Sequence, residues 1–480
     1  MDPSPLPEAD AAAMADLPAY AETRDSGVEW LGEVPAHWEV RRIAGLARIL
    51  NGATPSSTHA PYWGGHIPWI TPTDLGALAA GAAGAGRRIS RTARSLTTAG
   101  YDACGASLAP PDSLALSTRA PIGHLAILGR SCCTNQGCRL LVPSNHIRSE
   151  FLYYALSTFR EEMKAFGQGS TFSELSREKL AAFRIVQPPL AEQTAIARFL
   201  DYVDRRIRRY IHAKEKLIAL LEEQKQAVIH QAVTGQVDVR TGRPYPAYKD
   251  SGVEWLGKVP EHWDVRRAKQ LFKEADDRSA TGLEELLSVS HITGVTPRRS
   301  QKTVTMFEAR STVGYKLCQP GDIVVNTMWA WMAALGVARQ VGLVSPSYAI
   351  YRPLHPRKLA AEYVDFLLRT KTYRSEYRRR STGIRSSRLR LYPDEFLRIL
   401  MLCPPSEEQR AIVAFANKTS RDSQDAGALA ARQRSLLQRY RERLIADVVT
   451  GKLDVREAAA SLPEVGPLEE NEQRCQTAFI

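Results

Sequence analysis

The chain has 480 residues, 44% of them hydrophobic and 24% charged, which is enough for about two to four domains with their own cores. Its net charge of +12 is compatible with a polyanionic partner but does not require one. The seven cysteines form neither an even disulfide framework nor a CxxC metal pattern, which favours a reduced, cytoplasmic compartment.

Both ends of the chain are expected to be disordered tails. Residues 1–24 are acidic and rich in proline and alanine, with no basic region ahead of an apolar stretch, so they do not resemble a signal peptide. Residues 457–480 are also acidic. The run nearest to a membrane span, residues 323–338, is uncharged but short, and we expect it to form a buried strand, turn and strand.

The chain repeats itself. DSGVEWLGEVPAHWEVRR, at residues 25–42, returns as DSGVEWLGKVPEHWDVRR at residues 250–267. PPLAEQTAI and TGQVDVR, within residues 188–240, return as PPSEEQRAI and TGKLDVR within residues 404–456. The segments between these blocks differ in length and barely resemble each other. The simplest interpretation is one repeated scaffold that carries two different recognition segments.

The second block of each copy predicts a long helix. Residues 191–232 contain no proline or glycine and carry apolar residues at alternating spacings of three and four, and residues 407–449 keep the ends of this pattern. Small residues replace its middle in the second copy, which either allows close helix approach or weakens the helix near Gly427. Each helix is expected to end at a Thr-Gly pair. The residues expected to pair the helices are Ile196, Leu200, Val203, Ile207, Leu217, Leu221, Val228, Ile412, Leu437 and Leu444.

These patterns predict an α+β chain: two tandem mixed α/β domains separated by two long helices that pair as an antiparallel coiled coil, with a pseudo-two-fold internal repeat. The alternative, in which each helix packs on its own domain, is disfavoured by the length of the helices. The Gly/Ala tract at 76–86 is expected to be a flexible loop. The expected boundaries are domains at 25–187 and 251–403, helical spacers at 188–240 and 404–456, and a linker at 241–250.

Motifs for catalysis are missing. Residues 252–258 have the spacing of a phosphate-binding loop, but Val259 stands where Ser or Thr would hold magnesium. The Pro-Pro pairs at 188–189 and 404–405 lack the amide and aromatic neighbours of an adenine methyltransferase loop, and no zinc-type or serine-hydrolase motif occurs. Glu162 and Lys164 have a nuclease-like spacing that also arises by chance. We therefore expect no catalytic residue, no metal site and no enzyme activity.

The strongest functional signal is a basic run. Residues 371–390 hold eight Lys and Arg against one acid, with Tyr373 and Tyr377 interleaved, which favours nucleic-acid contact over a solvated helix face. The corresponding segment 167–177 is either a Ser/Thr-rich contact loop or an ordinary turn. The candidate DNA-contacting residues are Arg374, Arg378, Arg379, Arg380, Arg385, Arg388, Arg390, Ser170, Thr171, Thr54, Ser56 and Arg119.

The chain resembles the specificity (S) subunits of type I restriction-modification systems. The resemblance covers residues 25–456 and rests on NGATPSSTHAPYWGGHIPWITPTDL, STRAPIGHLAI, TNQGCRLLVP, GQGSTFSELSREKL and PPLAEQTAIARFLD in the first half. In the second half it rests on SVSHITGVTPR, GDIVVNTMWAW, GLVSPSYAIYRP and PPSEEQRAIVAF. The Gly/Ala tract at 76–86 departs from the family pattern.

The resemblance implies two target-recognition domains, at 25–187 and 251–403, that each read one half of a bipartite, asymmetric site in double-stranded DNA. It implies that two adenine methyltransferase subunits and the restriction and translocase subunits assemble around this chain. The chain itself then needs no cofactor, and S-adenosylmethionine and ATP are expected on the partner subunits. Two other readings stay open: a self-contained DNA methyltransferase or nuclease, and a coiled-coil adaptor that binds only proteins.

Overall fold

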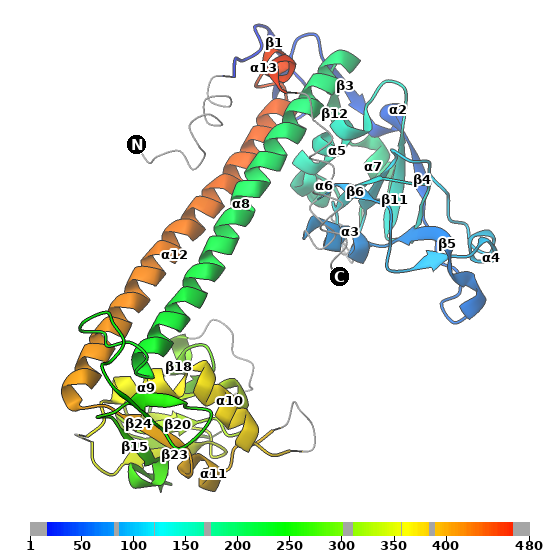
Figure 1. Cartoon of the computed structure of the whole chain (residues 1–480). Coiled ribbons are helices and arrows are strands. Elements are labelled where there is room, and N and C mark those ends of the chain that lie inside the picture. The colour runs from blue at the N-terminus through cyan, green and yellow to red at the C-terminus, as the bar shows by residue number, and fades with distance from the viewer. Residues whose placement is uncertain are drawn as a thin grey trace. The chain divides into compact units, whose positions relative to one another are not determined.

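The computed structural model describes residues 17–80, 86–119, 121–167, 174–300, 311–356, 358–383 and 389–463. The chain divides into two compact units (Figure 1). The first unit is formed from two stretches of sequence and the second unit from one. The first unit comprises residues 1–214 and 432–480, and the second unit comprises residues 215–431. Both contain sheets and helices, which confirms the α+β class.

The centre of the first unit is a five-stranded sheet with the order β4-β11-β8-β9-β6. Its strands are β4 (Ala47–Asn51), β6 (Arg88–Ile89), β8 (Leu114–Ser117), β9 (Leu125–Leu128) and β11 (Cys138–Pro143). A smaller sheet has the order β10-β5-β7, formed by β5 (Trp63–Ile70), β7 (Ser95–Leu96) and β10 (Cys133–Thr134). Two antiparallel strand pairs complete the first unit: β1 (Thr23–Asp25) with β2 (Glu33–Pro35), and β3 (Glu39–Arg42) with β12 (Arg184–Gln187).

The second unit repeats much of this order. Its central sheet has the order β16-β23-β20-β21, with β16 (Phe272–Ala275), β20 (Ile323–Val325), β21 (Leu335–Val337) and β23 (Ala349–Pro353). The pairs are β13 (Tyr248–Asp250) with β14 (Lys258–Pro260), β15 (Asp264–Arg267) with β24 (Leu400–Cys403), β17 (Leu287–Ser290) with β18 (Gly294–Pro297), and β19 (Lys316–Cys318) with β22 (Gly342–Val344). Segments with little sequence likeness therefore share a strand order.

The helices follow the same repeat. In the first unit they are α2 (Ile43–Leu46), η1 (Ala60–Tyr62), α3 (Pro72–Ala79), α4 (Thr98–Asp102), α5 (Ser149–Thr158), α6 (Arg160–Gly167), α7 (Arg177–Ala182) and α13 (Arg456–Ser461). In the second unit they are η2 (Ala268–Gln270), η3 (Arg298–Ser300), η4 (Ala330–Met332), α9 (Ala361–Leu368), α10 (Lys371–Arg380) and α11 (Pro393–Leu397). Two helices of 44 residues, α8 (Leu190–Val233) and α12 (Ser406–Val449), contribute to both units.

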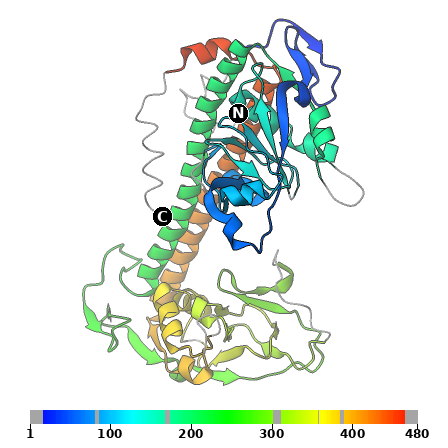
Figure 2. The same cartoon turned by 90° about the vertical axis from the view of Figure 1, so that its right-hand side faces the viewer.

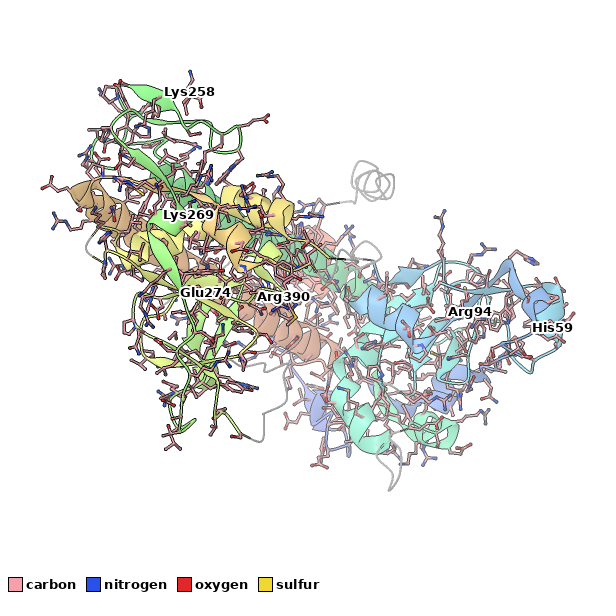
Figure 3. The ribbon with its side chains drawn as sticks, turned by 90° about the horizontal axis from the view of Figure 1, so that it is seen from below. His59, Arg94, Lys258, Lys269, Glu274 and Arg390 are labelled. Atoms are coloured by element: carbon pink, nitrogen blue, oxygen red, sulfur yellow. The ribbon has the colours of Figure 1, made fainter. Side chains whose placement is uncertain are left out.

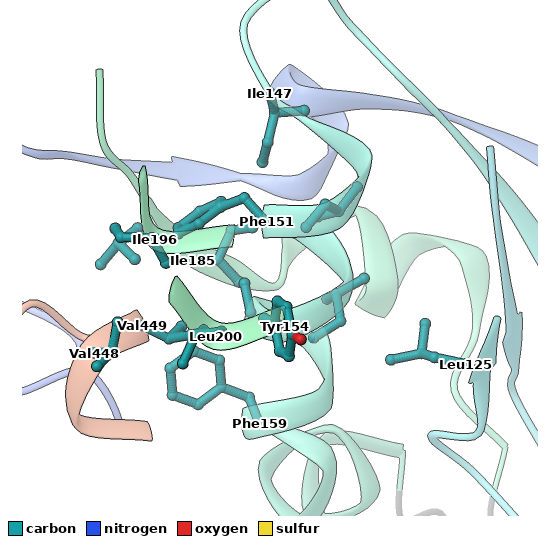
Figure 4. Packing of buried hydrophobic residues seen from close by; sticks show 14 of the residues in the cluster. Leu125, Ile147, Phe151, Tyr154, Phe159, Ile185, Ile196, Leu200, Val448 and Val449 are labelled. Carbon is teal, nitrogen blue, oxygen red and sulfur yellow. The ribbon is translucent and has the colours of Figure 1, made fainter. Parts of the chain in front are cut away.

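Within each unit, the portions of α8 and α12 lie side by side (Figures 1 and 2). In the first unit the predicted residues Ile196, Leu200, Val203 and Ile207 are buried in one cluster with Leu437 and Leu444. Figure 4 shows Ile196 and Leu200 of α8 near Val448 and Val449 of α12. In the second unit Ile412 is buried in one cluster with Ile229 and Val233. Burying such aliphatic side chains stabilises each unit by about 1.5 to 3 kcal/mol per residue before entropy is counted.

Leu217 departs from the predicted stripe. It is 42% exposed, while Leu221 and Val228 are half-buried. A helix of 3.6 residues per turn drifts away from a strict seven-residue repeat. One turn further along α8, the carbonyl of Leu221 accepts a hydrogen bond from the hydroxyl of the small residue Ser423 of α12 at 3.2 Å. Leu217 therefore lies outside the buried stripe of α8.

Several expectations for the ends and loops were wrong. Tyr20 is buried and residues 23–25 form β1, so residues 17–24 of the predicted tail are ordered. Residues 456–461 form α13, with Ala459 buried. Residues 76–79 of the Gly/Ala tract belong to α3, because Thr71 and Asp74 form a capping box and Leu75 and Leu78 are buried. Residues 81–85 lie outside the described part.

Other expectations were confirmed. The apolar run at 323–338 forms β20, η4 and β21, and β20 and β21 are antiparallel and buried. No helix in the described ranges is long and apolar enough to cross a membrane. Segment 151–166 forms two helices, α5 and α6, that are divided at Phe159, and segment 361–379 lies in α9 and α10.

The first Thr-Gly stop closes α8. Gly235 has φ +73°, and a Cβ there would lie 2.5–3.0 Å from Pro260 and Trp263 of the second opening block. Gly451 closes α12 in the same way, with φ +77° and a Cβ position 2.3–2.9 Å from Pro35 and Trp38. The left-handed backbone and the close approach both require glycine. The end of each helix thus packs against the opening block of the other copy.

Candidate nucleic-acid interface

Helix α10 carries the basic run, and its tyrosines belong to the core. Tyr373 and Tyr377 are fully buried and donate from their hydroxyls to the carbonyls of Leu400 and Leu368, both at 2.9 Å. Burial raises the pKa of both phenols. The expectation that these rings are interleaved with the arginines for nucleic-acid contact was therefore wrong, because both rings face inward and hold α10 on the unit.

A buried carboxylate divides the arginines of α10 into two groups. Glu376 is 2% exposed and accepts hydrogen bonds from Arg379 at 2.7 and 2.8 Å and from Arg380 at 2.5 Å. Burial alone would raise the pKa of Glu376, but these two guanidinium groups outweigh it and hold the pKa below its usual value. Arg380 also pairs with Glu395 at 2.9 Å. Arg379 and Arg380 therefore neutralise acids of their own unit.

Arg374 and Arg378 are not part of this network. Both are exposed, and neither forms an ion pair with any residue in the described ranges. Arg390 is exposed as well, and Figure 3 marks it in the second unit. The predicted residues Arg385 and Arg388 lie outside the described residues. Among the predicted contact residues described in this unit, Arg374, Arg378 and Arg390 are therefore the exposed arginines outside the Glu376 network.

In the first unit, Thr54 and Ser56 lie on an exposed loop that two tryptophans fix. The indole N–H of Trp63 donates to the carbonyl of Ser56 at 3.1 Å, and that of Trp69 donates to the carbonyl of Ala53 at 2.9 Å. The hydroxyl of Thr54 donates to the side chain of Gln136. Thr54 and Ser56 are thus held in place at the surface, as a preformed contact loop requires.

Sequence reasoning missed Arg94, which lies against the same tryptophans. Its guanidinium carbon is 3.4 Å from the ring centroid of Trp63 and 5.7 Å from that of Trp69. Arg94 and His59 are both marked in the first unit in Figure 3. The two tryptophans of WGGHIPWI were the signal for an aromatic cluster, but nothing in the sequence showed that a cation 25 to 31 residues away would stack on it.

Two loops occupy equivalent places in the two units. The loop after β8 holds Thr118, whose carbonyl accepts a hydrogen bond from Leu175 N–H at 2.9 Å. The loop after β20 holds Thr327, whose carbonyl accepts from Leu391 N–H, also at 2.9 Å. The residue after each threonine differs: it is Arg119, half-buried, in the first unit and Met328, exposed, in the second. Ser170 and Thr171, which were predicted as DNA-contacting residues, lie outside the described residues.

A third group of residues is equivalent in the two units and faces inward. Glu192 accepts hydrogen bonds from the Tyr20 hydroxyl at 3.1 Å and the Trp38 indole at 2.9 Å. The Nε2 atom of His37 lies 2.7 Å from the other carboxylate oxygen of Glu192.

In the second unit, Glu408 has the equivalent neighbours. Its carboxylate accepts hydrogen bonds from the Tyr245 hydroxyl at 3.0 Å and the Trp263 indole at 2.8 Å, and it lies 2.7 Å from Nε2 of His262. Burial alone would raise the pKa of Glu408, but the hydrogen bonds from Trp263, His262 and Tyr245 outweigh it and lower the pKa. Both carboxylates join a repeat block to its long helix. In the described residues no group of His, Cys, Asp and Glu could hold a metal ion.

The fold therefore comprises two compact units that share the order of their central strands and carry different residues on their paired loops. Residues 35–219 match the model of the type I restriction modification DNA specificity domain. The MjaIX specificity subunit of Methanocaldococcus jannaschii is 37% identical over 246 residues, which are 51% of this chain and 53% of that protein. The HindI specificity subunit of Haemophilus influenzae is 26% identical over 158 residues, 32% of this chain and 33% of that protein.

These matches span about half the length, or less, of the curated relatives. A structure solved in work on complex assembly and conformational transition of the type I R-M system covers 88% of this chain and 99% of its own, with a TM-score of 0.64 and 14% identity, which shows a shared fold. The resemblance inferred from the sequence is therefore confirmed: residues 35–219 match the family's DNA specificity domain, and the chain is similar to curated type I specificity subunits.

Proposed function

We propose that this chain is the sequence-specific DNA-binding subunit of a type I restriction-modification complex. The observation that carries the proposal is the pair of equivalent loops at Thr118 and Thr327, which the same backbone hydrogen bond holds but which present different side chains. Two identical heads read a palindrome, whereas two unlike heads on one frame read two unlike half-sites. The expected target is bipartite and asymmetric.

The DNA contacts of the second unit come from Arg374, Arg378 and Arg390, which are exposed cations on or beside α10. Those of the first unit come from Arg119, with Thr54 and Ser56 on the adjacent preformed loop. Arginine contributes both phosphate contacts and bidentate contacts to guanine, so these residues suit positioning as well as readout. Residues 25–187 and 251–403 then act as the two target-recognition domains.

The long helices separate the two recognition domains as an antiparallel coiled coil that sets the spacing of the half-sites. Support comes from the burial of Val203 and Ile207 with Leu437 and Leu444 in the first unit, and of Ile229 with Ile412 in the second. A spacer of this kind needs a fixed length, and a continuous helix of 44 residues provides one.

The repeated opening and closing blocks bind partner subunits. Two adenine methyltransferase subunits would bind equivalent surfaces of the two copies, and the restriction and translocase subunits would join the same complex. S-adenosylmethionine and ATP belong to those partners, and this chain is a recognition and assembly subunit without catalysis of its own. The repetition of these blocks around Glu192 and Glu408 supports equivalent binding surfaces.

Mapping methylated adenines in host cells with and without the gene tests the proposal. Loss of one asymmetric, bipartite methylation motif on deletion is the expected result. Unchanged methylation, or methyl transfer or cleavage by the purified chain alone, contradicts it. A protein-only adaptor would retain no DNA in a gel-shift experiment even when its partner subunits are present.

A further inference from the structure

We propose that Trp329 and Met328, at the tip of the loop between β20 and β21, form a specificity-determining contact with the bases of one half-site, beside the guanidinium of Arg390. This inference rests on the proposed function and deepens it. It assigns base readout in the second unit to an apolar and aromatic tip, in addition to the arginines of α10.

The side chains of this tip are exposed although they are large and apolar. Met328 is 47% exposed, Trp329 is 45% exposed, and Tyr392, on the segment that packs against the loop, is 50% exposed. Scattered apolar residues on a surface need no explanation, but apolar and aromatic residues gathered in one place indicate an interaction site. Trp and Tyr combine a large apolar face with a polar group, which suits an interface.

Exposure here does not come from a loose loop. The N–H of Asn326 donates to the carbonyl of Ala334 at 3.0 Å and closes the loop at its base. The indole of Trp331 donates to the carbonyl of Met328 at 3.1 Å and braces the tip from within. Ala333 takes a left-handed conformation with φ +64°, which completes the tight return to β21. A braced loop presents Met328 and Trp329 with little entropy left to lose on binding.

Arg390 is fixed beside this loop. Its Nε–H donates to the hydroxyl of Thr327 at 3.2 Å, and its guanidinium carbon lies 5.5 Å from the centroid of the Tyr392 ring. Among the described residues its two terminal amino groups have no other hydrogen-bond partner, so they remain available. A guanidinium held through Nε presents these groups as a planar fork, the geometry that contacts O6 and N7 of guanine.

The surroundings favour DNA over a protein as the occupant of this surface. Helix α10 packs against η4, so the exposed Arg374 and Arg378 belong to the element next to the tip. A polyanion with flat bases matches a tip of this kind, because phosphates pair with the cations while the apolar side chains contact thymine methyl groups or base edges. The Oδ1 atom of Asn326, buried below the tip, has no hydrogen-bond partner in the described residues.

The first unit gives the internal comparison. At the equivalent position after Thr118 it carries Arg119 in place of Met328. The loop closes in the same way, with the Ser117 N–H donating to the His124 carbonyl at 2.8 Å. One head therefore presents a cation where the other presents a thioether followed by an indole, and this is a chemical difference that base readout can use.

The test uses the full chain co-expressed with its cognate methyltransferase subunit and presented with random-sequence DNA duplexes, from which bound duplexes are recovered and sequenced. We expect Trp329→Ala to lower the preference for specific over non-specific duplexes about tenfold, with the loss confined to one half-site. The slope of affinity against salt should not change, because no phosphate contact is removed. Leu429→Ala, which removes a side chain 58% exposed on α12, is the matched control and should change neither quantity.

Met328→Ala is a second variant for the case in which Trp329→Ala lowers the Tm of the chain. An unchanged sequence preference at both half-sites overturns the inference, and so does weaker binding of the methyltransferase with normal DNA selection, which would make the tip a protein interface. A wild-type complex that selects no sequence would instead refute the proposed function itself, so the two failures are distinguishable.

Discussion

The guanidinium of Arg456 lies 3.9 Å from the carboxylate of Glu192, although the two residues belong to different copies of the repeat. In the second unit Arg240 and Glu408 have the same relationship at 3.2 Å. The closing block of each copy thus completes the site that the opening block and helix of the other copy begin. For this reason the compact units do not coincide with the repeats, and the first unit includes residues 432–480.

Glu408→Ala should destabilise the second unit by about 2 to 6 kcal/mol, because the buried donors of Tyr245 and Trp263 lose their acceptor and each unpaired donor costs about 1 to 3 kcal/mol. Glu192→Ala should do the same in the first unit. Glu407→Ala, one residue away and exposed, should change stability by less than about 0.5 kcal/mol. Urea denaturation followed by tryptophan fluorescence measures all three, and equal effects at residues 407 and 408 would contradict the assignment.

Alanine substitution at three glycines, two at helix ends and one inside a helix, should have opposite effects on stability. Gly235→Ala and Gly451→Ala should each destabilise by about 1 to 3 kcal/mol, because the left-handed backbone strains alanine and the new Cβ meets a proline and a tryptophan. Gly427→Ala should stabilise by about 0.5 to 1 kcal/mol, since this site is inside α12 and nothing lies within 4 Å of the new Cβ. Thermal unfolding of the three variants tests this order, and a stabilising change at Gly235 would contradict it.

Acid should destabilise the second unit partly through Glu408 and Glu376. Both carboxyls have a lower pKa in the folded chain than in the unfolded chain. Their contribution is therefore full above the unfolded value of about 4.3 and is lost as the pH falls through the folded value. We expect Glu408→Gln and Glu376→Gln to lose less free energy of unfolding than the wild type between about pH 5 and about pH 3. Parallel pH profiles for variants and wild type would count against this.

Substitutions of the arginines of α10 should fall into two groups, one that affects DNA binding and one that affects stability. Arg374→Ala and Arg378→Ala should each reduce the slope of log affinity against log salt by about 0.9 for every phosphate contact removed. Arg380→Ala should mainly lower stability, by about 1 to 3 kcal/mol, because it removes a partner from the buried Glu376. DNA titrations at several salt concentrations, together with denaturation, distinguish the two effects. An unchanged slope in Arg378→Ala would place this residue outside the DNA contact.

The proposed coiled-coil spacer can be tested by lengthening both of its helices. Insertion of seven residues near Lys214 of α8 together with seven near Ala430 of α12 adds ~10 Å of helix, which corresponds to ~3 base pairs of DNA. The methylated sequence should keep both half-sites and gain about this number of base pairs between them. A methylation motif with its original spacing would refute the role of the helices as a spacer.

The sequence by itself determined the features that depend on local or periodic signals. The repeats, the two long helices with their Thr-Gly ends, the buried run at 323–338 and the family resemblance all follow from patterns within short windows. The burial of Ile196, Leu200, Val203 and Ile207 was predicted because helical periodicity places them on one face.

Only the tertiary structure decided which distant residues meet. Periodicity could not show that Tyr373 and Tyr377 face the core or that Glu376 neutralises Arg379 and Arg380, because these outcomes depend on what packs against α10. Likewise, nothing local joins Arg456 to Glu192, or the segment of Arg390 to the loop of Trp329. Contacts between residues far apart in the sequence arise from chain topology, and topology also gave two dissimilar sequences the same strand order.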